Sequence, residues 1–149
     1  MNTRQKAILV EVVSILLVTL IAVVAMINFK DYINRSEAIS AMKQLGAIVV
    51  EYQKRNGRVP PESLVTDAVR DLKGGVRLGG FQYRGLWIDF DAEPNDILAY
   101  TQKNYPSSLL DDGYILLQVD GAVKWLDKNK FTELLAQQQS EVEIEMTRR

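Results

Sequence analysis

The sequence lacks cysteine and histidine altogether, and it has only four prolines among its 149 residues. The two absences exclude thiolate or imidazole metal sites, cysteine nucleophiles and histidine-based catalytic triads. They also exclude any disulfide that could stabilise the fold. Enzymatic chemistry would have to rely on carboxylates, lysine, serine or tyrosine, and we expect a protein that is not an enzyme.

An excess of charge of either sign is lacking as well, because 18 basic residues stand against 19 acidic ones and the formal net charge is −1. No long run of lysine or arginine occurs, whereas binding to nucleic acid requires clustered cations that neutralise phosphates. We therefore expect no nucleic acid among the partners of this protein.

Charge is nearly absent from one segment, Ala7–Ile27, where only Glu11, Ser14 and Thr19 interrupt the apolar residues. As a helix, this segment is about 31 Å long at about 1.5 Å per residue, close to the hydrocarbon thickness of a bilayer. A cleaved secretory signal would end in a small-x-small site, and no convincing one occurs here. The sequence predicts a retained membrane anchor in contact with lipid. The alternative is a helix buried in the core of the protein.

The charges that flank the apolar segment bear on its orientation. Arg4 and Lys6 precede the segment and favour a cytoplasmic N-terminus, although Lys30 and Arg35 follow it and nearly balance them. We expect a single-pass protein of the bacterial inner membrane whose larger, C-terminal part is extracytoplasmic, in the periplasm of a diderm cell.

Helical periodicity continues beyond the apolar segment, without proline, from Phe29 to about Arg55. Asn56-Gly57 and then Pro60-Pro61 predict where this helix ends. The sequence predicts one helix of nearly fifty residues, or two helices if a hinge forms near Asn28. Apolar residues recur at steps of three and four along its second half, namely Ile39, Met42, Leu45, Val49 and Tyr52.

The rest of the sequence predicts a small α+β domain. We divide the chain into a basic leader at 1–6, a transmembrane helix at 7–28, this domain at 29–138 and a mobile C-terminal tail at 139–149. The elements expected inside the domain are a helix from Pro61 to about Leu72, a strand or hairpin within Phe81–Phe90, a strand at Ile97–Tyr100, a hairpin of Gly113–Val119 and Ala122–Leu126 around the two-residue turn Asp120-Gly121, and a helix from Lys130 to about Gln138.

Four carboxylates crowd one predicted loop: Asp89, Asp91, Glu93 and Asp96. Alternating carboxylates can ligate Ca²⁺, but this spacing lacks the central glycine and terminal glutamate of an EF-hand loop. We expect no metal and no cofactor, with Ca²⁺ at this loop as the alternative. Acid–base catalysis would require Asp89 or Asp91 to share a pocket with Asp111, and nothing in the sequence indicates such a pocket.

Three stretches carry a family resemblance. The first, Ala7-Ile8-Leu9-Val10-Glu11-Val12, has a glutamate at the fifth position of a hydrophobic helix, and the second, from Val50 to Pro60, has a tyrosine followed by Asn56-Gly57 and proline. The third is the hairpin segment Tyr114–Trp125 with its Asp-Gly turn. With this layout the chain resembles type IV pilin-like proteins and, among them, the major pseudopilin of type II secretion.

The resemblance implies a long N-terminal helix on a small antiparallel sheet, and a structural role in a type II secretion or type IV pilus-like assembly. It also implies association with copies of itself or with other pseudopilin-like subunits through the N-terminal helix. In that family the glutamate pairs with the freed amine of a neighbouring subunit, so Glu11 would set the register of assembly.

The chain departs from the family at Lys6, which stands where the family's peptidase requires a small residue, usually glycine. We therefore expect an uncleaved leader, with Glu11 pairing to Lys6, Arg4 or another chain. The alternative function is a membrane-anchored extracytoplasmic binding module that does not assemble into a filament.

Overall fold

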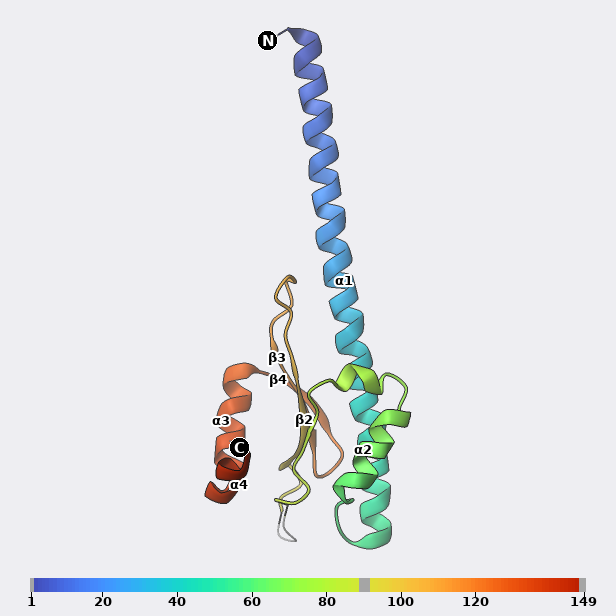
Figure 1. Cartoon of the computed structure of the whole chain (residues 1–149), viewed down its shortest axis with the longest axis vertical. Coiled ribbons are helices and arrows are strands. Elements are labelled where there is room, and N and C mark those ends of the chain that lie inside the picture. Colours follow the sequence, from blue (N-terminus) through green and yellow to red (C-terminus); the bar gives the residue numbers. More distant parts are fainter. Residues whose placement is uncertain (1, 89–91, 148–149) are drawn as a thin grey trace.

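The computed structural model describes residues 2–88 and 92–147 of the chain. Within these residues a long N-terminal helix packs against a four-stranded antiparallel sheet of strand order β1-β2-β3-β4 (Figure 1), which confirms the predicted α+β class. The elements are α1 (Thr3–Asn56), α2 (Glu62–Asp71), the 3₁₀ helix η1 (Gly75–Leu78), β1 (Gln82–Tyr83), β2 (Ile97–Lys103), β3 (Gly113–Gln118), β4 (Val123–Asp127), α3 (Lys128–Gln138) and α4 (Glu141–Thr147).

Helix α1 is continuous over 54 residues, a length of about 81 Å. It passes through Asn28 without a break, so the hinge considered there is wrong, and the Asn28 side-chain nitrogen donates a hydrogen bond to the Val24 carbonyl at 2.8 Å. The helix ends where the sequence predicts, because Gly57 adopts a left-handed conformation with φ of 69° and its N–H caps the Gln53 carbonyl.

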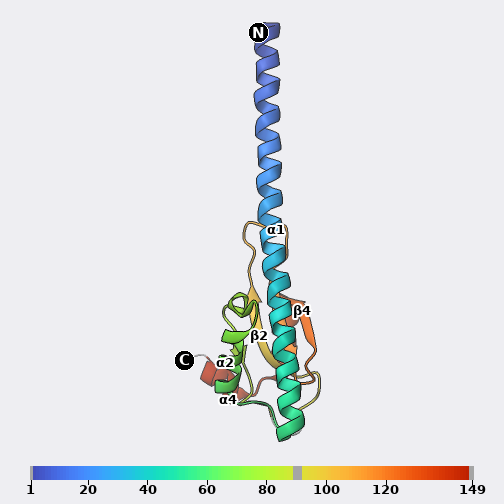
Figure 2. The same ribbon diagram turned by 90° about the vertical axis from the view of Figure 1, so that its right-hand side faces the viewer.

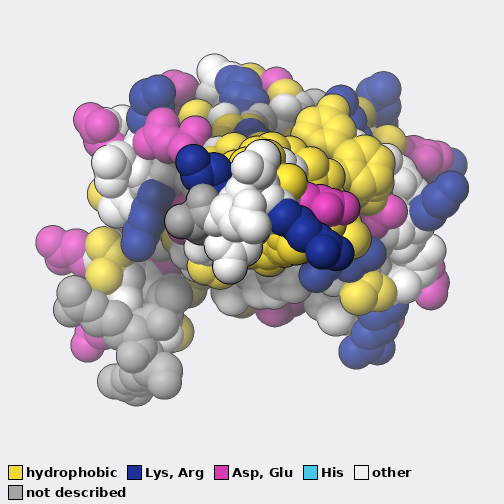
Figure 3. All heavy atoms as spheres, turned by 90° about the horizontal axis from the view of Figure 1, so that it is seen from above, with side chains coloured by type: hydrophobic (Ala, Val, Ile, Leu, Met, Phe, Trp, Pro, Cys, Tyr) yellow, Lys and Arg dark blue, Asp and Glu magenta, His cyan; other side chains and the backbone are white. Residues whose placement is uncertain are grey.

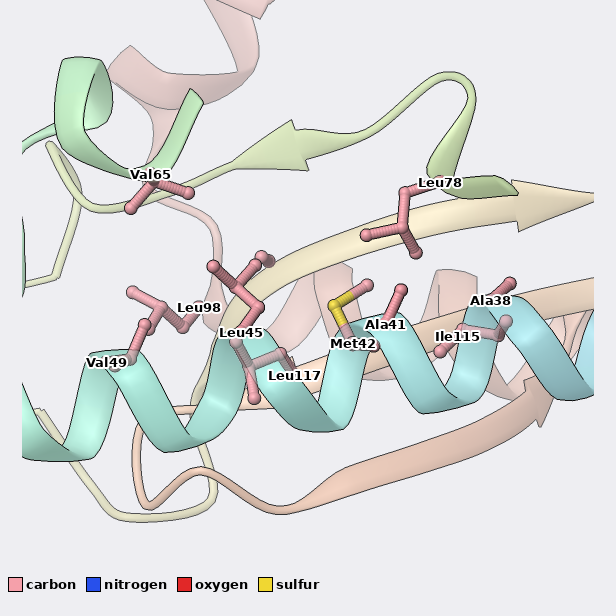
Figure 4. Packing of buried hydrophobic residues seen from close by; sticks show 11 residues of the cluster. Ala38, Ala41, Met42, Leu45, Val49, Val65, Leu78, Leu98, Ile115 and Leu117 are labelled. Atoms are coloured by element: carbon pink, nitrogen blue, oxygen red, sulfur yellow. The ribbon is translucent and has the colours of Figure 1, made fainter. Parts of the chain in front are cut away.

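The C-terminal half of α1 forms the spine of the domain. Its inward-facing side chains pack on one face of the sheet, against Ile115 and Leu117 of β3, while Val65 of α2 and Leu78 of η1 cover the flank (Figure 4). Gly46 lets the helix approach closely, since a Cβ there would lie 2.7 Å from the Gly121 carbonyl oxygen. The fully buried side chains of this stripe are Ala38, Ala41, Met42, Leu45 and Val49.

The opposite face of the sheet is covered by α3, so the sheet lies between two helical layers (Figure 1). Ile97 and Leu116 pack with Phe131 of α3, and the Tyr114 ring stacks on the Phe131 ring with centroids 3.8 Å apart. This double coverage explains why β3 reads as a nearly continuous apolar run instead of an alternating one.

The β3–β4 turn lies at Asp120-Gly121, but it is not the two-residue turn predicted. The Gln118 amide donates to the Ala122 carbonyl and the Gly121 amide to the Gln118 carbonyl, so residues 119–121 form a three-residue loop. Gly121 has a φ of 87°, whereas no non-glycine residue described has a positive φ. A type I turn followed by a left-handed glycine satisfies the hairpin with one positive φ instead of two.

The structure forms a helix where the sequence analysis predicted a mobile tail. Helix α4 carries Glu143, which forms an ion pair with Arg84 at 2.6 Å while both side chains are at most 4% exposed. The same guanidinium donates to the carbonyls of Ile97 and Gln138. Arg84 thus ties the end of β1, the start of β2 and both C-terminal helices together, and this network holds the tail on the domain.

Candidate functional site

The N-terminal half of α1 projects beyond the domain (Figures 1 and 2). Every residue from 2 to 26 is exposed, and none of the most apolar 18-residue window of the helix is buried. Viewed along α1 from above, hydrophobic side chains gather around the centre, and most charged side chains lie around the rim (Figure 3). The alternative of a helix buried in the protein's own core is therefore wrong.

Among the residues described, α1 is the one helix long and apolar enough to cross a membrane by its length and composition. Leu16, Val18 and Leu20 are among the side chains most exposed along it. Soluble monomers rarely expose apolar surfaces this large, and such a surface marks contact with a membrane or with another protein. This half of α1 is the candidate functional site.

Glu11 lies on this surface and has no charged partner on its own helix. Lys6 is five residues earlier, which places it about 140° around the helix at about 3.6 residues per turn. Arg4 is seven residues earlier, on nearly the same face but about 10 Å away along the axis. Within the described part of the chain no ion pair joins Glu11 to either cation. The described residues thus show Glu11 paired with neither Lys6 nor Arg4 of its own chain.

A second feature lies at the junction between the apolar half of α1 and the domain. The β2–β3 loop, residues 104–112, runs alongside α1 in both views (Figures 1 and 2). Asn28 Oδ1 accepts hydrogen bonds from Ser108 Oγ at 2.9 Å and from the Leu109 amide at 2.7 Å. The base of the loop is closed by a hydrogen bond from the Tyr105 amide to Asp112 Oδ1 at 2.6 Å. The sequence predicts no more than a polar, proline-containing connection at Lys103–Asp112.

The Tyr105 side chain is buried at the base of this loop. Burial raises the pKa of its phenol above the usual value, because removal from water disfavours the phenolate. The nearby guanidinium of Arg35 acts in the opposite direction, and its effect is smaller. Tyr105 thus stays neutral and supports the loop by packing.

The acidic loop is only partly described. Asp89 and Asp91 lie outside the described residues, while Asp96 Oδ2 accepts a hydrogen bond from the Glu93 amide at 2.9 Å and closes a local turn. In the described part of the chain no group of three or more acidic residues is arranged to hold a metal ion. The acid–base site considered from the sequence combines Asp89 or Asp91 with Asp111, and it likewise depends on residues outside the described ones.

A cavity of about 460 Å³ lies at the end of the domain remote from the exposed half of α1. Its walls come from the C-terminal end of α1, the start of α2 and the segment after β1. They bring the opposite charges of Arg58 and Glu62 to one opening. The lining side chains include Gln53, Arg58, Glu62 and Leu86.

The sequence does not indicate the long-range contacts of three residues: Arg84, Glu143 and Asn28. Each acts through a partner between 59 and 81 positions away in the chain. The one local signal was the position of Asn28, a polar residue directly after the apolar segment.

No protein-family model, curated protein or solved structure matches this chain. The resemblance to pilin-like proteins therefore stays a prediction from motifs and layout. The function must be inferred from the exposed helix and the domain it carries.

Proposed function

We propose that this protein is a pseudopilin-like, single-pass protein of the bacterial inner membrane, a structural component of a type II secretion or type IV pilus-like assembly. The observation that carries the proposal is the continuity of α1. One unbroken helix is exposed and apolar over its first half and serves as the buried spine of the domain over its second half. Movement of the anchor is thereby coupled rigidly to the domain.

The exposed half can be buried in two ways that do not exclude each other, by lipid or by the same helix of neighbouring subunits. The apolar side chains from Ile8 to Met26 extend around the whole circumference of the helix and not along one stripe. A helix apolar on all sides is typical of a membrane span or of the centre of a helix bundle. The N-terminus lies in the cytoplasm and the domain is extracytoplasmic in this proposal.

Glu11 sets the axial register of the bundle in this proposal. An ionisable side chain in an apolar environment is costly unless it is paired, and no described cation of its own helix pairs with it. A basic group of a neighbouring chain, from Lys6 or Arg4, would satisfy Glu11 only when the two helices are staggered correctly.

Site-specific crosslinking between full-length chains in membranes tests this role. The protein has no natural cysteine, so Leu16→Cys supplies the only thiol for disulfide crosslinking. We expect Glu11→Ala to reduce the crosslinked dimer severalfold and Val13→Ala, an exposed apolar control, to leave it unchanged. Near-ultraviolet circular dichroism should show an intact domain in both variants. Undiminished crosslinking in Glu11→Ala would rule out the register role.

The cavity at the membrane-distal end favours a second candidate function, a membrane-anchored extracytoplasmic binding module that does not assemble. Lys6 is consistent with this alternative, because an uncleaved subunit keeps its leader. The intact mass of protein recovered from membranes separates the two. Loss of the six residues Met1–Lys6 supports assembly, whereas retention of the leader together with the absence of self-crosslinks supports the binding module.

A further inference from the structure

We propose that the β2–β3 loop is a second membrane contact, with Leu109 inserted into the interfacial region of the bilayer in which α1 is anchored. The inference rests on the membrane span proposed above and adds a contact made by the domain itself. The partner is a phospholipid surface.

The inference rests first on the position of the loop tip along the axis of α1. Asn28 directly follows Ile27, the last residue of the apolar segment, and therefore lies where the helix would leave the hydrocarbon. The hydrogen bonds from Ser108 and from the Leu109 amide to Asn28 Oδ1 hold the tip of the loop at this level. The Asn28 side-chain nitrogen donates a hydrogen bond to the Val24 carbonyl, and this hydrogen bond fixes the orientation of Asn28 Oδ1.

The exposure of the tip supports the same conclusion. The Leu109 side chain is 85% exposed although its amide is bonded to the helix, so the protein itself does not bury it. Residues 104–110 carry no charge, and the nearest charged residues along the sequence, Lys103 and Asp111, flank them on either side. An uncharged tip with an exposed leucine can enter a headgroup layer without taking a charge out of water.

The surface of α1 next to Asn28 has the composition of a membrane interface. Phe29 and Tyr32 are both exposed there, and aromatic side chains are enriched at the level of lipid headgroups. Lipid is favoured over a second copy of the chain because the loop tip, these aromatic side chains and the end of the apolar segment share one level along the helix axis. A second copy would need a complementary surface, whereas a bilayer is present wherever α1 is inserted.

Two contacts would restrict the domain more than one. A single helix in a bilayer can rotate about its own axis and tilt freely, and packing or interfacial anchors set both angles. Leu109 lies off the axis of α1, on the loop beside it, and so would fix which side of the domain faces the membrane.

The absence of cysteine makes a direct test possible with the full-length chain. Leu109→Cys, Leu86→Cys and Val18→Cys each introduce a single thiol for an environment-sensitive fluorophore. Leu86 is the matched control because it is an equally apolar and similarly exposed side chain, at 80%, located at the membrane-distal cavity. Val18, in the middle of the apolar segment, reports the membrane span independently. Each labelled protein is reconstituted, at high lipid-to-protein ratio, in phosphatidylcholine–phosphatidylglycerol vesicles that carry nitroxide-labelled lipid.

We expect the nitroxide lipid to quench the labels at positions 18 and 109 severalfold more than the label at position 86, with emission at 109 shifted to shorter wavelength on reconstitution. Quenching at 18 together with a label at 109 that behaves like the one at 86 would overturn the loop contact and leave the span intact. Absence of quenching at 18 would overturn the span and the loop contact together. A shift of the emission at 109 to shorter wavelength that disappears when the protein is diluted further in lipid would assign the loop to a second copy of the chain. That result would likewise overturn the proposal.

Discussion

The two halves of α1 have the same backbone geometry and opposite relations to the rest of the protein. From Ala7 to Met26 apolar side chains cover all sides of the helix and are exposed, whereas between residues 38 and 49 one stripe is fully buried, namely Ala38, Ala41, Met42, Leu45 and Val49. The angular distribution of apolar residues, and not their presence alone, therefore distinguishes a helix that needs an apolar solvent from one that needs a sheet. The absence of a break at Asn28 shows that one rigid element can serve both needs.

The same contrast extends to two carboxylates. Glu143 in the domain is buried and forms an ion pair with Arg84 of its own chain. Glu11 in the exposed half has no ion pair with the described cations of its helix. The domain thus pairs this buried carboxylate within the chain, whereas we propose that Glu11 pairs with a basic group of a neighbouring chain.

The largest effect is expected from breaking the buried ion pair. Glu143→Gln leaves the Arg84 guanidinium buried without its counter-charge and should lower the free energy of unfolding of the domain by about 3–5 kcal/mol. Urea unfolding in detergent micelles, followed by tryptophan fluorescence, measures this. The control is Glu37→Gln, because Glu37 pairs with Arg77 at 2.8 Å while both side chains remain about half exposed. This control should lower the free energy of unfolding by less than about 1 kcal/mol. Equal decreases in the two variants would contradict the assigned role of Glu143.

The second prediction compares leucines from the two halves of α1. Leu45 is fully buried against the sheet, so Leu45→Ala should destabilise the domain by about 2–5 kcal/mol through lost burial and the cavity left behind. Leu17→Ala, in the exposed half, should change the stability of the domain by less than about 0.5 kcal/mol. The same urea titration in micelles compares the two. A large loss for Leu17→Ala would mean that the exposed half packs on the domain.

The third prediction concerns the closest approach of α1 to the sheet. A Cβ at Gly46 would lie 2.7 Å from the Gly121 carbonyl oxygen and 2.9 Å from Leu117 Cδ1, so Gly46→Ala should cost about 1–3 kcal/mol. At Gly79 an added Cβ meets nothing within 4 Å and φ is −51°. Gly79→Ala should therefore be neutral or slightly stabilising, because it restricts the unfolded chain. Thermal unfolding of both variants checks this prediction. A lower unfolding temperature for Gly46→Ala alone indicates the steric clash, whereas equal decreases in both variants would contradict it.

The smallest effect on the domain is expected from Glu11→Gln, which removes the charge from the exposed half. The unfolding free energy of the domain should stay within about 0.5 kcal/mol of wild type, because Glu11 is exposed on the half of α1 that projects beyond the domain. Self-association measured by crosslinking should fall in the same variant. A change in stability without a change in association would reverse the roles assigned to the two halves of α1.

Local patterns were sufficient to predict α1, its C-terminal stop and the closing hairpin. The three- and four-residue steps of Met42, Leu45 and Val49 identify the buried stripe, and Gly57 with the following prolines identifies the stop. The hairpin was placed correctly, but its loop was one residue longer than the Asp-Gly pair suggested. That difference depends on the pairing of Gln118 with Ala122, which the turn residues alone do not determine.

Contacts between distant parts of the chain were not predictable in this way. Helix α4 has alternating charged and apolar residues that are typical of a solvated tail, and it is held because Arg84, more than fifty positions earlier, meets Glu143. The loop at Leu109 is held by Asn28 in a similar manner. Strand β1 is only two residues long although aromatic residues surround it, because the chain turns at Arg84, where the Trp87 amide bonds to the Arg84 carbonyl.

The most direct test of the central claim is protease digestion of bacterial spheroplasts that express the full-length chain with an N-terminal epitope. If α1 spans the inner membrane with its N-terminus inside, external protease removes the domain from about residue 29 onward and leaves a short, membrane-bound fragment that keeps the epitope. Recovery of the undigested chain from intact spheroplasts, with digestion only after lysis, would contradict this topology and the proposed function with it.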